Sequence, residues 1–420
     1  MKTRKKIFLC FILCGMIWTL QGQNKISSPY SRFGLGNLEP ICNGFSRAMG
    51  GVAYTQQNSA AINFANPASY VAFDSLSFTA DVVGSVVFGT LTNAQTSQKS
   101  TLGRLDYLSI GFPLLKVWRT SFGILPYSFT GYAIYDKKTN SLTGAYTHLY
   151  EGNGGLKKLY WGNGFKIYKN LSAGLNISYL FGSLDQIKSV EFEETGFLNS
   201  RMIASNSING LLFDAGLQYF FDIKNTHRIG FGAVYTNAAH VWVTQKNEYL
   251  NYTGTELNAA IRDTIPLEKE NKTSLTFPQS AGGGISYQFK DKLLAGVDFT
   301  WQDWSSFALG GIGDSLRDNF ITSLGIQYTI NPNASKYVQK INWRLGFKYE
   351  TGYLLLRETA VSGFSISAGL GLPFRRTKST LNFFLEYGER GKASLIRENY
   401  FKVGFQFILH EKWYRQQKLN

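Results

Sequence analysis

The chain has 420 residues and a formal net charge of +15, and 15% of its residues are aromatic. Its 43 glycines and nine prolines suit a protein of many strands, whereas no segment after Leu20 resembles the helix of roughly 20 apolar residues that crosses a membrane. Three cysteines exclude a disulfide framework, because two of them, Cys10 and Cys14, lie in a segment that we expect to be removed.

Residues 1–22 have the layout of a secretory signal peptide. Basic residues among the first six positions precede an apolar run from Ile7 to Leu20, and small or polar residues follow up to Gly22. Export argues against a nucleic-acid partner for this basic chain. Attraction to the anionic head groups of outer-membrane lipid and lipopolysaccharide accounts for the charge instead.

Residues 23–74 show no strand pattern. They contain three stretches rich in small residues, at 28–36, 46–53 and 58–69, which suit tight turns and close backbone packing. A barrel of about fourteen strands is too wide for its side chains alone to fill. We therefore predict that residues 23–74 form an N-terminal plug, or hatch, in the lumen of a barrel.

Residues 75–409 repeat a two-residue alternation of apolar and polar side chains many times. In the stretch 293–302, for example, the apolar residues Val297 and Phe299 flank Asp298. Such a strand buries one face in an apolar environment and keeps the other face polar. The strands run about 10 to 15 residues, as a tilted membrane crossing requires. The pattern predicts an all-β fold, a transmembrane antiparallel β-barrel.

Counting these segments up and down gives fourteen strands, an even number that returns the chain to the periplasmic side. Short links, which we assign to periplasmic turns, alternate with longer polar links, which we assign to external loops: 185–205, 245–272, 308–316 and 351–360. Residues 410–420 follow as a periplasmic tail, either inert or used for docking. The predicted strands are 75–89, 103–112, 120–135, 143–168, 171–182, 206–222, 227–243, 273–289, 293–307, 317–331, 340–350, 361–374, 379–389 and 397–409.

Two motifs in residues 23–74 carry a resemblance to a known family. The stretch RAMGG, from Arg47 to Gly51, and the small-residue stretch from Asn58 to Ser69 resemble the N-terminal hatch of the FadL/TodX family of long-chain fatty-acid transporters. Two features depart from the family: Ser69 stands where glycine is usual, and the chain continues past the last strand. The resemblance assigns the hatch to six residues, which are Arg47, Gly50, Gly51, Asn66, Pro67 and Ala68.

The resemblance also implies passive uptake, in which a small hydrophobic molecule enters the barrel and leaves sideways through an opening in the third strand. Proline cannot donate to a strand ladder, and every strand of a closed barrel is central. Pro126, between Gly123 and Gly131, therefore predicts locally broken pairing at the place where the resemblance puts a lateral opening. The alternative is a bulge that only tightens the curvature of the wall.

The sequence shows no pattern typical of an enzyme, a metal site or a cofactor site. The four histidines, His148, His227, His240 and His410, have no zinc-like spacing. The glycine-rich stretches lack the strand–loop–helix context of a phosphate loop. We therefore expect no catalytic residues, no metal and no cofactor.

Two functions fit a multi-pass barrel of the gram-negative outer membrane. The first is a channel for passive uptake of fatty-acid-like hydrophobic molecules by lateral diffusion. The second is a non-transporting barrel subunit of an outer-membrane secretion or assembly complex, which would have other outer-membrane proteins as partners. The aromatic and basic residues Trp413, Tyr414 and Arg415, and the unusual stretch 28–34, favour the second function.

Overall fold

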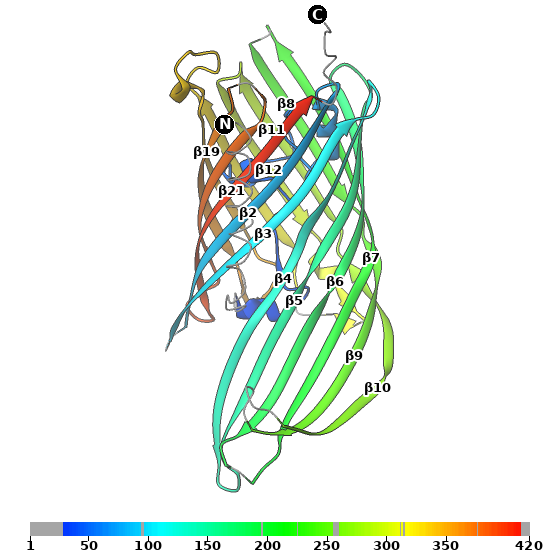
Figure 1. Cartoon of the computed structure of the whole chain (residues 1–420), viewed down its shortest axis with the longest axis vertical. Helices are drawn as coiled ribbons and strands as arrows, with labels where there is room; N and C mark the ends of the chain where they lie inside the picture. The colour runs from blue at the N-terminus through cyan, green and yellow to red at the C-terminus, as the bar shows by residue number, and fades with distance from the viewer. Residues whose placement is uncertain are drawn as a thin grey trace, which may run out of the picture.

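The computed structural model describes residues 28–412, apart from 94–95, 195, 225, 255–259, 311, 314–315 and 376. The predicted signal peptide and most of the predicted tail lie outside the described residues. Fourteen antiparallel strands form a closed barrel, in which the last strand pairs with the first (Figure 1). The ring runs through β2 (Ser77–Thr92), β3 (Ser97–Pro113), β4 (Trp118–Asn140), β5 (Gly144–Lys166), β6 (Leu171–Phe192), β7 (Asn199–Ile223), β8 (His227–Thr236), β11 (Ser280–Phe289), β12 (Leu293–Gln302), β15 (Asn319–Thr329), β16 (Asn342–Glu350), β19 (Gly363–Pro373), β20 (Thr380–Arg390) and β21 (Arg397–Lys412).

Two of the predicted strands are each divided by a short irregular link. Asn237 and Ala238 separate β8 from β9 (Ala239–Thr253), and the link at 278–279 separates β10 (Ala260–Phe277) from β11. β8 and β9 both pair with β7, while β11 pairs with β8 and β10 pairs with β9. Each divided pair therefore works as one long strand, and the predicted count of fourteen is confirmed.

The barrel wall is apolar outside and polar inside. In β12, Val297 and Phe299 are 48% and 49% exposed, whereas Asp298 between them is 3% exposed. Around the ring, outward Phe, Leu, Ile, Val and Tyr side chains form an apolar belt, and inward Ser, Asn, Asp and Gln side chains are buried. A soluble sandwich buries its apolar face, so this reversal identifies the belt as the surface that faces lipid. None of the described helices is long and apolar enough to cross a membrane.

Tryptophans of the described residues occupy two kinds of environment. Trp242 and Trp343 project outward and are exposed, as rings at head-group level should be. Trp304, in contrast, is fully buried and stacks on Tyr353 with 4.8 Å between the ring centroids. Its 3-10 helix, η4 (Trp304–Ser306), belongs to an apolar cluster at the mouth of the barrel that also contains Leu35.

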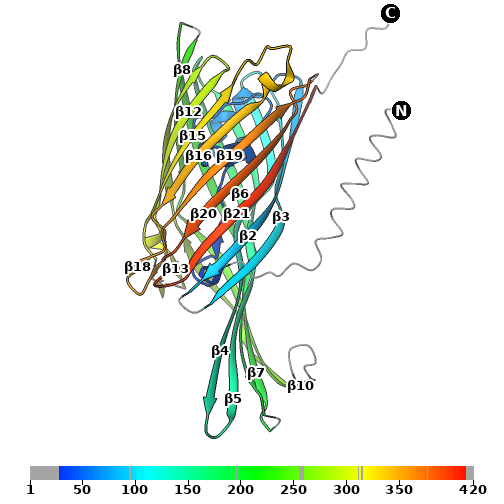
Figure 2. The same cartoon turned by 90° about the vertical axis from the view of Figure 1, so that its left-hand side faces the viewer.

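At the end away from the last residues of β21, the barrel is extended by parts of β4, β5, β6, β7, β9 and β10 (Figures 1 and 2). We call this extension the outer sheet. The predicted external loops 185–205 and 245–272 are therefore wrong for the most part. β6 and β7 stay paired as far as Val190↔Ser200, and β9 pairs with β10 from Ala239↔Phe277 to Thr253↔Ala260. Both faces of the outer sheet carry polar residues, which hides the alternation that marks the barrel strands. The outer sheet comprises 132–140 of β4, 144–152 of β5, 185–192 of β6, 199–206 of β7, 245–253 of β9 and 260–271 of β10.

Residues 28–73, which we call the N-terminal segment, pack against the inner face of the wall. They contain only short elements: η1 (Pro29–Arg32), β1 (Asn37–Leu38), α2 (Gly44–Arg47) and η2 (Pro67–Ala72). Asn43 caps α2, because its side-chain oxygen accepts a hydrogen bond from the Ser46 amide at 3.0 Å. The same side chain donates to the Ile62 carbonyl at 3.0 Å, which ties the helix to a later part of the segment.

Candidate functional site

Buried ion pairs join the N-terminal segment to β3. Arg47 is 4% exposed, and its guanidinium pairs with the carboxylate of Asp106, an inward residue of β3. Arg104 also binds Asp106, with 2.8 Å between Nε and Oδ1, and holds the Glu39 carboxylate through two bonds of 2.6 Å. Two separate points of the N-terminal segment, Arg47 and Glu39, are therefore held by one strand.

Side chains from other strands bind the backbone of the segment directly. Asp298 of β12 accepts hydrogen bonds from the Ala53 amide at 2.6 Å and from the Tyr54 amide at 2.9 Å. Ser367 of β19 accepts a hydrogen bond from the Gly50 amide at 2.9 Å. Bonds that involve a charged acceptor are roughly twice as strong as neutral ones. Asp298 is therefore a principal anchor of the segment on the far side of the ring from β3.

A row of wall glycines, which we call the glycine row, lets the segment approach the strands closely. At each position an added Cβ would meet an atom of the segment at less than 3.0 Å. The tightest is Gly346, where a Cβ would lie 1.9 Å from the Gly50 nitrogen. Wall and segment are thus in direct contact on seven strands. The row is Gly174 of β6, Gly216 of β7, Gly232 of β8, Gly296 of β12, Gly325 of β15, Gly346 of β16 and Gly369 of β19.

The predicted hatch residues lie in this contact region at two separate places. Arg47, Gly50 and Gly51 face β3, β15 and β16. Gly50 and Gly51 have φ angles of +66° and +93°, which glycine adopts without strain. A side chain on Gly50 would also meet the Phe347 and Leu324 carbonyl oxygens at 2.5 and 2.6 Å. Two requirements, conformation and space, therefore fix glycine at position 50.

The second motif sits against β6 and β7. The Asn66 side chain caps η2 by accepting from the Ala68 amide at 3.1 Å, and it donates to the Leu217 carbonyl of β7 at 3.1 Å. Pro67 lies against Gly174, where a Cβ would meet its carbonyl carbon at 2.3 Å. The motif therefore fixes both the shape of η2 and its position on the wall. That the whole segment acts as a hatch stays a prediction.

The residues predicted to form a lateral opening lie where the β3–β4 ladder ends. Gly123 still pairs with Ser109 of β3, but the last pair is Leu108↔Ile124. On the other side of β4 the register with β5 shifts between Pro126 and Ser128. β1 of the N-terminal segment then lies along β4, with Leu38↔Ser128 and Asn37↔Phe129.

The N-terminal segment fills the place that β3 leaves. The Glu39 amide donates to the Tyr127 carbonyl of β4 at 2.9 Å, while the Glu39 carboxylate binds Arg104 of β3. Further out, the Ser28 amide donates to the Gly131 carbonyl at 3.0 Å. The interruption of the ladder is therefore bridged by residues of the segment. That it serves as a lateral exit stays a prediction.

A cavity of about 580 Å³ opens at the mouth of the barrel, below the outer sheet. Its lining combines apolar side chains with Arg32, Thr273 and four side-chain amides, which lie toward the outer sheet. Such a mixture of apolar surface and a few polar groups is typical of small-molecule sites. The apolar residues include Leu35, Leu184, Ile208, Val243, Leu275 and Phe307, and the amides are Gln186, Asn206, Gln245 and Asn271.

The part of the chain that the structure describes contains no group of three or more His, Cys, Asp or Glu residues placed to hold a metal ion. The four histidines are spread over distant strands. His227 binds the outward Tyr287 hydroxyl at 2.6 Å, and His410 lies 3.0 Å from the Thr79 hydroxyl. Both contacts position side chains within the wall.

Sequence reasoning missed the acidic anchors Asp106 and Asp298 and the arginine Arg344. All three are inward residues of barrel strands, and each is at most 6% exposed. A charged residue on the polar face of an alternating strand was the available signal. It does not say which residues the charge will meet, because alternation along one strand carries no information about contacts across the lumen or between strands.

Comparisons with known proteins agree on the architecture. The toluene transporter TodX of P. putida is 16% identical, with a TM-score of 0.60 over 91% of this chain and 100% of that one. The CymD monoaromatic hydrocarbon channel is 16% identical with a TM-score of 0.57, over 90% and 98% of the two chains. A FadL homologue of Pseudomonas aeruginosa is 14% identical with a TM-score of 0.56, over 90% and 100%.

At these identities the likeness shows the fold, so the FadL/TodX resemblance is confirmed at that level. No curated protein matches the sequence significantly. A family model described as BamG matches residues 4–420.

Proposed function

This chain belongs to the BamG family, and we propose that it is a non-transporting barrel subunit of an assembly complex in the outer membrane of a gram-negative bacterium. The observation that carries the proposal is the close contact between the N-terminal segment and the wall along the glycine row. The BamG match over almost the whole chain favours assembly over transport.

A gate for passive uptake has to move at low energetic cost. Here the Arg47–Asp106 pair is buried, and breaking such a pair by removing one partner typically costs about 3–5 kcal/mol. Asp298 and Ser367 add three hydrogen bonds to the backbone of the segment. Displacing the segment would break all of these contacts together, which supports a permanent filling rather than a gate.

The outer sheet supports a role in contacting other proteins. Five aromatic rings form a line from the barrel mouth toward the tip of the outer sheet, with neighbouring ring centroids 5.2 to 6.2 Å apart. We call this line the aromatic ribbon. Aromatic residues are enriched at protein interfaces, where they supply large contact areas. The ribbon consists of Tyr150, His148 and Tyr146 of β5, Phe192 of β6, and Phe197 in the following turn.

The second candidate is the hydrophobic-molecule channel with lateral diffusion. The cavity at the barrel mouth and the interrupted β3–β4 ladder favour it, and the fold is that of hydrocarbon channels. Under this candidate, a molecule held near Val243 would leave beside Pro126. The N-terminal segment would then have to withdraw from the edge of β4.

Native mass spectrometry after gentle extraction from the cell membrane distinguishes the two candidates. We expect the barrel with a stoichiometric protein partner and no bound small molecule. A lone barrel that carries hydrophobic ligands would overturn the proposal in favour of the channel.

A pair of variants sharpens the result. V243W fills the cavity, and replacement of residues 137–147 by Asn-Gly removes the tip of the outer sheet, including Tyr146. The assembly role predicts loss of the partner only in the shortened variant. The channel predicts loss of uptake of a labelled hydrocarbon into proteoliposomes only in V243W.

A further inference from the structure

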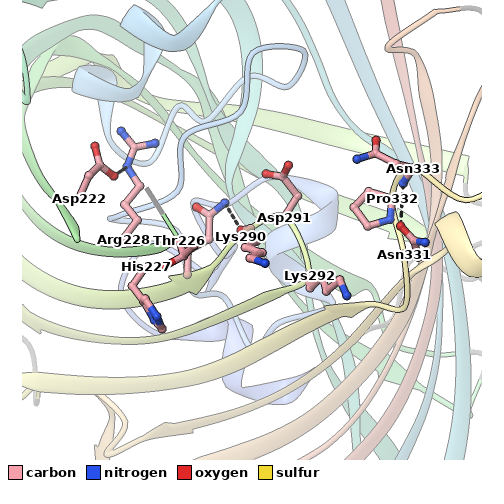
Figure 3. A pocket seen from close by; sticks show the side chains of 11 residues that line it. Asp222, Thr226, His227, Arg228, Lys290, Asp291, Lys292, Asn331, Pro332 and Asn333 are labelled. Atoms are coloured by element: carbon pink, nitrogen blue, oxygen red, sulfur yellow. Dashed lines mark hydrogen bonds and ion pairs between the residues drawn. The ribbon is translucent and has the colours of Figure 1, made fainter. Parts of the chain in front are cut away.

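Two adjoining cavities of about 510 and 300 Å³ lie at the end of the barrel opposite the outer sheet. Their shared lining residues include Arg228, Lys290, Asp291 and Lys292, and we call the two cavities together the turn pocket (Figure 3). Three turns surround it: β7–β8, β11–β12 and β15–β16. Residues 55–58 of the N-terminal segment form its floor.

The rim of the turn pocket is built from hydrogen bonds between turns. The Lys290 amide donates to the Thr226 carbonyl at 2.7 Å, and the Thr329 amide donates to the Lys292 carbonyl at 2.7 Å. Lys290 has a φ of +49°, a region in which glycine or asparagine is less strained than lysine. Lys290 therefore places a cation on the rim at a conformational cost, and the hydrogen bonds between the turns hold the rim in shape.

The lining of the turn pocket has more positive than negative side chains. Asp222 is the partner of Arg228, with 3.3 Å between Oδ1 and Nε. Asp291 is then the remaining acidic side chain among the described lining residues, which also include the cations Lys290, Lys292 and Arg344.

Arg344 is a buried cation without an acidic partner among the described residues. It is 6% exposed and lies in the inner part of the pocket. Its Nε donates to the Gln327 side-chain oxygen at 2.7 Å, and Nη1 donates to that of Asn382 at 2.8 Å. Both acceptors are neutral, so they satisfy hydrogen bonds but leave the charge uncompensated. An anion that enters the turn pocket would supply the missing charge.

We propose that the turn pocket binds the carboxylates of an acidic polypeptide segment from a periplasmic partner. The proposal rests on the assembly role and names the chemistry of one contact in it. A phosphate group of a lipid would offer the same charge, but the pocket opens between the turns and the N-terminal segment, inside the ring. The lipid-facing side chains next to it, Phe221 and Tyr287, point away on the outer surface.

The test uses the full-length barrel in nanodiscs of phosphatidylcholine and a fluorescein-labelled hexaglutamate peptide, followed by fluorescence anisotropy. We expect saturable binding that weakens as salt is added. The double variant K290Q/K292Q should bind roughly tenfold more weakly at low ionic strength, because two of the cations near the peptide are gone. K169Q is the matched control, since Lys169 is an exposed lysine of another turn at the same end. It should bind as the wild type does.

R344M removes the inner charge and keeps the apolar stem, and it too should weaken binding. Equal binding by all variants, or no binding by the wild type, would overturn the proposal. Nanodiscs of phosphatidylglycerol provide a further arm: if they abolish peptide binding to both the wild type and K169Q, whose turn pocket is unchanged, an anionic lipid occupies the site and the proposal fails.

A second readout separates this proposal from the assembly role on which it rests. If K290Q/K292Q is extracted with its partner as the wild type is, the turn pocket is not the contact and the assembly role stands. If the wild type itself has no partner, the assembly role fails first.

Discussion

Strands β4 to β7 pass through two environments. In the barrel their inward side chains meet the N-terminal segment, which supplies backbone hydrogen-bonding groups and close van der Waals contact. In the outer sheet the same strands keep their ladders, but most of their contacts come from neighbouring strands. The strands are paired in the same way in both regions. We therefore expect the barrel part to be more stable than the outer sheet, because the N-terminal segment contacts mainly the barrel part. Each prediction below tests that difference.

The largest expected effect comes from breaking a buried charge pair. R47A should lower the free energy of unfolding by about 3–5 kcal/mol, because it leaves Asp106 with a buried and only partly compensated charge. K137A breaks the exposed pair with Glu193 in the outer sheet and should cost about 0–1 kcal/mol. Denaturant unfolding followed by gel mobility of the folded barrel measures both. Equal costs would contradict the comparison.

A single methyl group on the glycine row should have the next largest effect. In G346A the new Cβ would lie 1.9 Å from the Gly50 nitrogen, so the segment must shift. We expect this shift to lower the free energy of unfolding by about 1–3 kcal/mol. In G283A the nearest atom is the Gly232 oxygen at 3.9 Å, so the same change should be close to neutral. A melting temperature that drops equally in both variants would mean that strand propensity, rather than contact with the segment, sets the cost.

Amide hydrogen exchange can make the comparison without mutation, along one strand. Residues 172–180 and 186–190 of β6 are both paired with β5 and β7. We expect the outer stretch to exchange at least about 100-fold faster, because it lacks lipid on one side and the N-terminal segment on the other. Uniform protection along β6 would show that the ladder alone determines stability.

The smallest effect should follow removal of the sheet tip. Replacing residues 137–147 by Asn-Gly joins Asp136 to His148, which already face each other across the ladder, through a two-residue turn. The free energy of unfolding should stay within about 0.5 kcal/mol of the wild-type value, since no contact of the N-terminal segment is lost. Circular dichroism during denaturation checks this, and a large loss would mean that the outer sheet helps hold the barrel closed.

The barrel could be predicted from the sequence because lipid imposes a simple rule on each strand. Val297 and Phe299 face outward whatever the rest of the chain does, so alternation alone locates β12. No such rule applies to the outer sheet, where residues 185–192 and 199–205 carry polar side chains on both faces. They were predicted as loops for that reason, although their pairing is as regular as that of the barrel.

Only the N-terminal motifs of the candidate site could be predicted from the sequence. The stretch from Arg47 to Gly51 and the tripeptide Asn66-Pro67-Ala68 stand out by composition and by resemblance. Their wall partners do not, because Asp298 and Ser367 lie more than 200 residues away along the chain and are chosen by the barrel register. Arg344 is recognisable as unpaired only when the neighbours of β16 are known.

The end of the β3–β4 ladder at Leu108↔Ile124 has a mechanical consequence. Where the ring of strands is unbroken, a radial load is carried around the circumference by hydrogen bonds that would all have to stretch. Above Ile124 the circumference is interrupted, and a load there bends the strands apart against the ion pair of Glu39 with Arg104. A pull on the outer sheet would therefore widen the barrel only at the end that carries this sheet, by separating β3 from β4 beyond Ile124.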